Sequence, residues 1–203
     1  MKRFLDIVLS AIGLLVLLPL LPFVALLIKL DSRGPIFFLQ ERIGKDFKSF
    51  LIYKFRTMTI DADKKGARLT AVGDKRVTNI GRVLRRFKID ELPQLFNVLK
   101  GDMSFVGPRP EVTEYVRLFE TDYRKLLTIR PGITDPASLE YSNEESILGD
   151  PKVSEDVYIS KVLPEKIRLS SQYVDNHALM TDLKLILMTL LKASHIQRNK
   201  TAA

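Results

Sequence analysis

The 203-residue chain contains no cysteine and no tryptophan, and its only two histidines are His177 and His195. Without cysteine, disulfides, thiolate catalysis and cysteine-ligated zinc are excluded. Two histidines late in the chain argue against a histidine-based triad and against a histidine-rich metal site. The chain also lacks GxGxxG and GxxxxGKS/T, the motifs of the commonest nucleotide-binding folds. Any reaction must therefore rely on carboxylates, hydroxyls, amines or a hard metal ion.

Acidic residues are fewer than basic ones: the chain has 24 aspartates and glutamates and 32 lysines and arginines, which give a net charge of +8. A basic surface favours partners that carry phosphate, namely nucleic acid, anionic lipid or a nucleotide substrate. The length predicts one domain of ordinary size with enough chain for a real core.

Charged residues are absent from Ile7 to Ile28, a run that reaches the roughly 20 residues of a membrane-spanning helix. A signal peptide, a spanning anchor and a re-entrant segment are the three interpretations. The signal peptide is disfavoured because no A-x-A cleavage pattern follows. Pro19 and Pro22 predict a kink past the middle of the run. Both flanks are basic, which favours keeping both ends on the cytoplasmic side. The residues alone leave a re-entrant segment and a kinked spanning helix open.

The rest of the chain predicts a helix-rich α+β fold with a small β-hairpin. Two runs rich in aromatic and β-branched residues, 36–43 and 47–57, flank a Gly-Lys-Asp turn. A polar, charged segment over 59–78 reads as a long exposed loop that could close over a ligand. The pattern then predicts mostly helix, with loops at "SFVGPRPE" and "RPGIT". The predicted helical segments are 79–100 in two pieces, 111–127, 142–149, 157–174 and the amphipathic segment 180–192, which could lie in a membrane interface.

Two adjacent acids, Asp90 and Glu91, stand between the basic run "RVLRRFK" and an apolar helical pattern. Pro93 suits the first turn of that helix and Gly101 suits its C-terminal cap. One interpretation is a helix start, where negative charge is favourable. The other is a reactive pair, because carboxylates bind Mg²⁺ beside phosphates and can attack phosphorus. The apolar stripe of this helix consists of Ile89, Leu92, Leu95, Phe96 and Leu99.

Several basic residues sit in settings that suit phosphate binding. Arg109 lies between two prolines in "GPRP", which fixes the backbone for bidentate contact. Lys54 and Arg56 lie two residues apart on one face of a predicted strand. Arg130 begins "RPGIT", and Arg85 belongs to the run before the acids. For each, a solvated surface residue is the alternative.

The strings "KFRTM", "LRRFKIDELPQLFNVLKGDMSFVGPRP" and "RPGIT", in this order after an apolar segment, resemble the bacterial sugar transferase family. The chain is similar over nearly its whole length to the small monotopic phosphoglycosyl transferases. The resemblance implies transfer of a phosphosugar from a UDP-sugar to a polyprenyl phosphate, with Mg²⁺ and release of UMP, at the cytoplasmic face of the bacterial inner membrane. It also implies a re-entrant membrane helix and its flanks over 1–33 and a cytoplasmic catalytic domain with interfacial helices over 34–203.

The resemblance also assigns site residues. Asp90 matches the nucleophile and Glu91 the second acid, and both are expected metal ligands. The positions expected to hold phosphates or the nucleotide are Lys54, Arg85, Arg109 and Arg130.

Two departures from the family pattern stand out. The helix break typically carries Ser-Pro, whereas here Leu18-Pro19 and Leu21-Pro22 are both candidates. After "RPGIT" the chain continues "DPASL" in place of Gly and an apolar residue, which bears on sugar or nucleotide contacts.

The expected partners are a UDP-sugar, a polyprenyl phosphate and membrane lipids, without nucleic acid, and a homodimer is left open. Two other functions fit parts of the pattern: a non-catalytic, membrane-tethered basic module for anionic lipid or nucleic acid, and a Mg²⁺-dependent hydrolase of lipid diphosphates. The sequence does not indicate which sugar is transferred.

Overall fold

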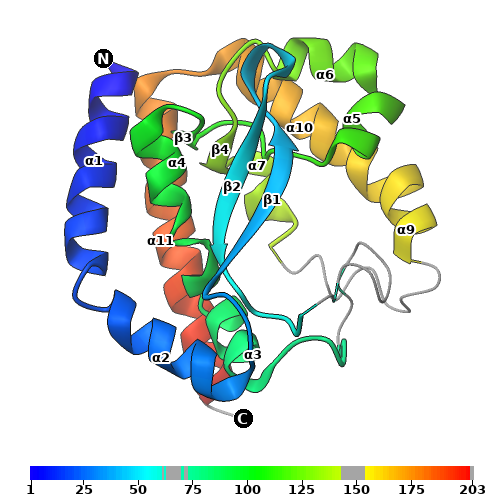
Figure 1. Cartoon of the computed structure of the whole chain (residues 1–203). Coiled ribbons are helices and arrows are strands. Elements are labelled where there is room, and N and C mark those ends of the chain that lie inside the picture. The colour runs from blue at the N-terminus through cyan, green and yellow to red at the C-terminus, as the bar shows by residue number, and fades with distance from the viewer. Residues whose placement is uncertain (61, 63–69, 71–72, 143–153, 202–203) are drawn as a thin grey trace.

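The central feature of the fold is an antiparallel hairpin of β1 (Phe37–Ile43) and β2 (Ser49–Phe55), paired from Phe37–Phe55 to Ile43–Ser49. The computed structural model describes residues 1–60, 62, 70, 73–142 and 154–201 (Figure 1). The predicted hairpin is confirmed, but its connection is longer than a Gly-Lys-Asp turn. It contains the 3₁₀ turn η1 (Lys45–Phe47), in which Asp46 and Phe47 have positive φ.

A second, parallel sheet joins β3 (Ser104–Val106) to β4 (Gly132–Thr134). The prediction of loops at these two segments is wrong, because three-residue strands are too short to show a hydrophobic period. Gly132 is needed there, since a Cβ would lie 2.1 Å from the backbone nitrogen of Gly107. The predicted single helix over 111–127 is also interrupted, giving α5 (Thr113–Leu118) and α6 (Glu120–Leu126).

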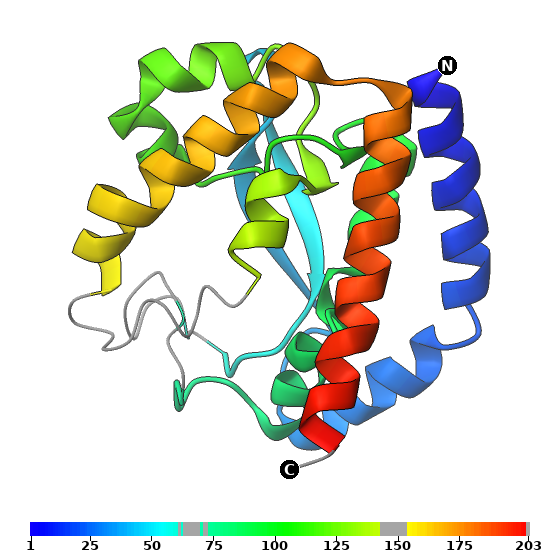
Figure 2. The same cartoon turned by 180° about the vertical axis from the view of Figure 1, so that it is seen from behind.

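The remaining helices flank the hairpin and cover one of its faces, which makes the fold helix-rich α+β, as predicted (Figures 1 and 2). The main apolar core joins the end of β1 to α5, α6 and the helix α10 (Leu163–Asn176). Most of the helix predicted over 142–149 lies outside the described residues, as do most of 61–72. The other elements are α3 (Asn79–Arg86), η3 (Ile89–Glu91), α4 (Gln94–Lys100), α7 (Pro136–Glu140), α9 (Ser154–Val157), η4 (Tyr158–Val162), α10 (Leu163–Asn176) and α11 (Leu179–Thr201).

The N-terminal apolar run forms two helices, α1 (Lys2–Leu17) and α2 (Leu21–Asp31), bent by 62°. Pro19 lies in the break between them, and Pro22 is in the first turn of α2. In the described chain no single helix is long and apolar enough to cross a membrane, whereas this bent pair meets the test of length and composition together.

Polar contacts at its N-terminal end fix α1 to the rest of the fold. The buried carboxylate of Asp6 accepts hydrogen bonds from Ser104 Oγ (3.0 Å) and the backbone nitrogen of Phe105 (3.1 Å), both on β3. Lys2 Nζ forms an ion pair of 2.7 Å with Asp182 on α11. As a result, α1 runs along α4 and α11 at one side of the molecule (Figures 1 and 2).

The helix after the acid pair, α4, packs through a mixed face in which the polar Gln94 and Asn97 are buried together with Leu95 and Val98. The fully buried side chain of Asn97 accepts from the backbone nitrogen of Tyr53 (3.0 Å) and donates to the carbonyl of Leu51 (2.7 Å), so it joins α4 to β2. Leu92, Phe96 and Leu99, which the periodicity assigns to one apolar stripe, are each more than a third exposed. Gly101 ends α4 with φ of +98°, as its predicted capping role requires.

Replacing Asn97 with leucine, a side chain of the same branched shape without polar atoms, should destabilise the protein. The change leaves the Tyr53 amide and the Leu51 carbonyl without their partner, at about 1–3 kcal/mol per unpaired buried group. Denaturant unfolding of the detergent-solubilised protein would measure the loss, with the exposed Asn176→Leu as the matched control. Equal stability of the two variants would show that Asn97 does not hold β2 to α4.

Candidate active site

The acid pair lies in a short 3₁₀ turn between two helices. α3 ends at Arg86, and Lys88 then adopts a left-handed conformation with φ of +56°. This reversal starts η3 and turns Asp90 inward, so that only 8% of this residue is exposed. Pro93 follows as the N-terminal cap of α4, which needs no backbone donor there. The predicted helix start is therefore real, and it buries one of its two acids.

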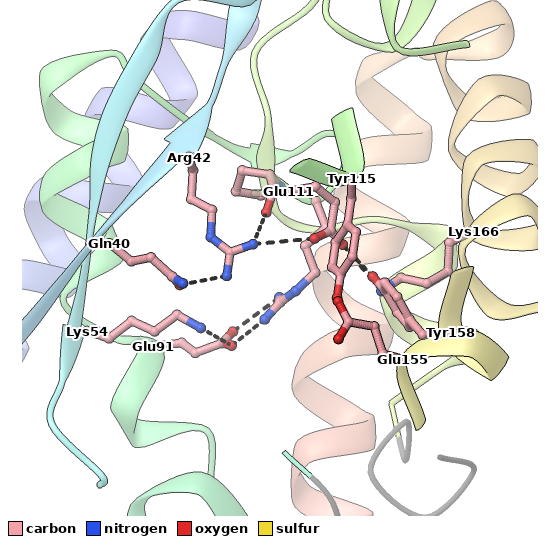
Figure 3. Close-up of polar contacts among 11 residues, drawn as sticks. Gln40, Arg42, Lys54, Glu91, Glu111, Tyr115, Glu155, Tyr158 and Lys166 are labelled. Atoms are coloured by element: carbon pink, nitrogen blue, oxygen red, sulfur yellow. Dashed lines mark hydrogen bonds and ion pairs between the residues drawn. The ribbon is translucent and has the colours of Figure 1, made fainter. Parts of the chain in front are cut away.

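Glu91 holds two basic residues from distant segments. Its Oε1 lies 2.6 Å from Arg109 Nη2 and 3.3 Å from Lys54 Nζ, and Oε2 accepts from Arg109 Nη1 at 3.4 Å. The side chains of Lys54 and Glu91 point toward one another from β2 and η3 (Figure 3). Burial alone would raise the pKa of Glu91, but the charges of Arg109 and Lys54 outweigh it and hold that pKa well below its usual value. Glu91 is therefore a fixed anion.

Asp90 has the opposite electrostatic character. Its Oδ1 is buried without a hydrogen-bond partner in the described chain, and so is Nε2 of the nearby Gln94. Burial, and next the negative charge of Glu91, raise the pKa of the Asp90 carboxyl, although Lys54 and Arg85 oppose this. Buried polar atoms are nearly always paired, so this unpaired carboxylate oxygen beside cationic side chains marks Asp90 as a candidate for binding or reaction.

Magnesium fits this donor set only together with a substrate. Among the described residues no group of three or more acidic, histidine or cysteine side chains could hold a metal ion. Mg²⁺ is often bound through one or two carboxylates plus substrate phosphates, and the unpaired Asp90 Oδ1 could serve as such a ligand. The Glu91 oxygens already accept from Lys54 and Arg109, which leaves Asp90 as the better ligand.

A second buried polar cluster, which the sequence did not predict, adjoins Arg109. Glu111 accepts from Tyr158 Oη at 2.7 Å and pairs with Arg42 at 3.3 Å and with Lys166 at 3.7 Å (Figure 3). Burial would raise the pKa of Glu111, but Lys166 and Arg42 outweigh it and lower that pKa. The only sequence signal was the position of Glu111 directly after "GPRP". The contacts of Glu111 with Arg42, Tyr158 and Lys166 therefore anchor the "GPRP" loop that carries Arg109.

The other basic residues assigned by resemblance lie at two places. Arg85, on α3, is near enough for its charge to lower the pKa of Asp90. Arg130 is exposed, and its Nε donates to the Gly101 carbonyl at the end of α4 (2.8 Å). Thus Asp90, Glu91, Lys54, Arg85 and Arg109 share one electrostatic site, whereas the Arg130 guanidinium contacts the end of a helix.

The "DPASL" departure from the family pattern has a structural role in this chain. Asp135 is fully buried and caps α7 by accepting from the backbone nitrogen of Ser138 at 2.7 Å. Its other oxygen accepts from Ser170 Oγ on α10 at 2.6 Å. The aspartate therefore fixes α7 against α10.

Comparison with known proteins agrees with the resemblance in the motifs. The family model described as bacterial sugar transferase matches residues 1–195, so the chain belongs to the bacterial sugar transferase family. It is 40% identical over 194 residues to the UDP-N-acetylgalactosamine-undecaprenyl-phosphate N-acetylgalactosaminephosphotransferase of Aeromonas hydrophila, a match that covers 93% of this chain and 42% of that relative.

Two further relatives differ in how much of their own length the match covers. The undecaprenyl-phosphate glucose phosphotransferase of Komagataeibacter xylinus is 40% identical over 196 residues, which cover 93% of this chain and 35% of that protein. The exopolysaccharide production protein PSS of Rhizobium leguminosarum bv. phaseoli is 39% identical over 210 residues, which cover 98% and 97% of the two chains. The chain therefore spans less than half of the first two relatives and nearly all of the third.

Replacing Asp90 with asparagine should stabilise the fold at neutral pH. The pKa of Asp90 is higher in the folded protein than its ordinary value of 3.8. Protonated Asp90 therefore contributes fully to the free energy of unfolding below pH 3.8, and this contribution is lost as the pH rises through the raised pKa. Asparagine resembles the protonated form at every pH. We expect a gain on the order of 1 kcal/mol, or roughly 2–4 °C in Tm, at pH 7.

Thermal unfolding of the solubilised protein at pH 7 and near pH 4 would test this. The difference between the variant and the wild type should shrink at the lower pH. The control is Asp175→Asn, which removes the same charge from an exposed site on α10. A loss of stability in Asp90→Asn at pH 7 would contradict the view that the ionised carboxylate is destabilising in its buried position.

Proposed function

We propose that this chain transfers a phosphosugar from a UDP-sugar to a polyprenyl phosphate such as undecaprenyl phosphate, releasing UMP. The observation that carries the proposal is the buried, unpaired Asp90 oxygen beside the Lys54–Glu91–Arg109 ion pairs, in a chain of the bacterial sugar transferase family. Two relatives are named for transferring different sugars, N-acetylgalactosamine and glucose, to undecaprenyl phosphate. The sugar carried by the donor of this chain is therefore left unassigned.

In the first step, an oxygen of the Asp90 carboxylate attacks the phosphorus that carries the sugar. The bond from this phosphorus to the bridging oxygen breaks, UMP leaves, and a phosphosugar-aspartyl intermediate remains. Lys54 and Arg109, held in place by Glu91, neutralise the charge that develops on the departing phosphate. Mg²⁺, when bound at Asp90 with the phosphates of the donor, would add positive charge at the same place.

In the second step, a phosphate oxygen of the polyprenyl phosphate attacks the same phosphorus and displaces Asp90. The products are the polyprenyl-diphosphate sugar and a regenerated carboxylate. Glu91 is held ionised with a low pKa, so it is a poor proton acceptor. Its role here is to orient Arg109 and Lys54.

The exposed apolar side chains support the membrane placement that belongs to this proposal. The bent α1–α2 pair enters and leaves on the cytoplasmic side of the bacterial inner membrane, as its basic flanks favour. α11 lies in the interface and adds to the same apolar surface. This surface holds the site at the depth of a lipid-bound phosphate. The exposed apolar side chains include Phe4, Leu15, Leu18, Phe23, Leu26 and Leu30 on or beside the pair, and Met180, Leu187 and Leu190 on α11.

Release of UMP from a panel of UDP-sugars is the direct test. Without acceptor, the wild type should release one burst of UMP per enzyme with its own donor and should acquire label from a sugar-phosphate-labelled UDP-sugar. Asp90→Asn should give neither burst nor label, and Asp175→Asn should match the wild type. Turnover by Asp90→Asn would remove Asp90 as the nucleophile. Binding of UDP-sugars without any UMP release would indicate a binding module.

The pH dependence of kcat/KM for the donor should report the ionisation of Asp90 in the free protein. Glu91 raises the pKa of Asp90 and Lys54 lowers it. Glu91→Gln should therefore move the acid limb of the profile to lower pH, and Lys54→Met should move it to higher pH. Both variants should also lose on the order of 10²-fold in rate, because each removes part of the preorganised charge. Shifts in the same direction would argue against Asp90 as the titrating group.

A further inference from the structure

Arg56 lies two residues after Lys54, just beyond the end of β2, and only 6% of it is exposed. Its guanidinium donates to two carbonyls, that of Ser32 at 2.7 Å and that of Arg33 by a short hydrogen bond. Its backbone nitrogen donates to the carbonyl of Ile36 at 2.9 Å. Both side-chain acceptors directly follow α2, so Arg56 binds the exit of the apolar helix pair.

The loop after α2 is shaped around this guanidinium. Gly34 has φ of +124°, and a Cβ at this position would lie 2.1 Å from Arg56 Nη1. A side chain there would push the guanidinium out, so glycine is needed for both its conformation and its size. The loop after α2 therefore provides both the carbonyls that bind the Arg56 guanidinium and the space at Gly34 that it needs.

A second contact ties the same exit to the acid pair. Asp31, the last residue of α2, accepts from the backbone nitrogen of Ile80 at 2.8 Å. Ile80 lies in the first turn of α3, which leads directly to η3 and Asp90. The end of α2 is thus fixed to the strand that carries Lys54 and to the helix that precedes Asp90.

We infer that Arg56 is a positioning residue for the lipid acceptor, an inference that rests on the proposed function. By holding the α2 exit to β2, it sets the distance between the membrane surface and Asp90. A UDP-sugar is soluble in water and can approach at any height, whereas the phosphate of a long-chain acceptor is held at the height of the interface. A misplacement of about 1 Å can cost on the order of 10²-fold in rate, and here that loss would fall on the acceptor step.

The geometry specifies arginine. The planar guanidinium reaches the Ser32 and Arg33 carbonyls through two nitrogens, Nη2 and Nη1. Lysine would keep the charge but could not span both acceptors in the same fixed geometry. Arg33 supplies a matched control, because its exposed side chain carries the same charge in the same loop while only its carbonyl binds Arg56.

The experiment compares the full-length wild type with Arg56→Lys, Arg56→Met and Arg33→Met in phospholipid nanodiscs. Three quantities are measured: the UMP burst without acceptor, kcat/KM for undecaprenyl phosphate, and kcat/KM for a short, water-soluble prenyl phosphate. We expect both Arg56 variants to keep the burst and the short-chain reaction within about twofold of the wild type. Their kcat/KM for undecaprenyl phosphate should fall by on the order of 10-fold or more. Arg33→Met should resemble the wild type in all three.

Equal losses in the burst and with both acceptors would overturn the inference, because a purely structural role lowers all three. Unchanged kcat/KM for undecaprenyl phosphate in both Arg56 variants would overturn it as well. If Arg56→Met does not fold, Arg56→Lys alone decides between these results. A wild type that releases no UMP from any UDP-sugar would instead contradict the proposed function, since that measurement involves no change at Arg56.

Discussion

The partly buried ion pairs of Glu91 with Arg109 and Lys54 are the constraint on which the rest of the site depends. They join three segments that are distant in sequence: strand β2, turn η3 and the proline-flanked loop after β3. Glu91 is the most enclosed of the three side chains, at 12% exposed, so loss of its basic partners would leave a largely desolvated charge, and this holds the three segments together. In a chain with a net charge of +8, this anion also keeps two cations close together beside Asp90.

Two neighbouring acids acquire different chemistry from their contacts alone. Glu91 faces Arg109 and Lys54 and stays ionised, whereas Asp90 is turned inward with an unpaired oxygen and a raised pKa. Pairs of carboxyl groups whose environments push their pKa values apart commonly divide the work of a reaction between them. Since the charge of Glu91 is one cause of the raised pKa of Asp90, a change at Glu91 also changes the ionisation of Asp90. The same arrangement makes the site costly in stability.

The sequence predicted the features that depend on residues close together in the chain. The hairpin follows from its aromatic and β-branched runs, and the end of α4 follows from Gly101. It did not predict the β3–β4 pair or the contact between Arg42 and Glu111, because both depend on the meeting of distant segments. The periodicity of α4 was misleading for a similar reason, since polar Asn97 is buried by its bonds to β2. Family motifs grouped Arg130 with the phosphate-binding residues, and the structure adds a contact that no motif indicates, the hydrogen bond from its Nε to the Gly101 carbonyl.

The two prolines of the apolar segment have different consequences, which explains how the bend occurs. Pro19 cannot donate to the Leu15 carbonyl, so the hydrogen-bond ladder of α1 stops there and the break lies at residues 18–20. Pro22 falls in the first turn of α2, where a backbone nitrogen needs no helical partner, so it starts the second helix without strain. Asp6 fixes the beginning of the pair to β3, and Arg56 fixes its end to β2. With both ends bound to strands of the catalytic fold, a bend near the middle places the apolar turn at a defined distance from Asp90.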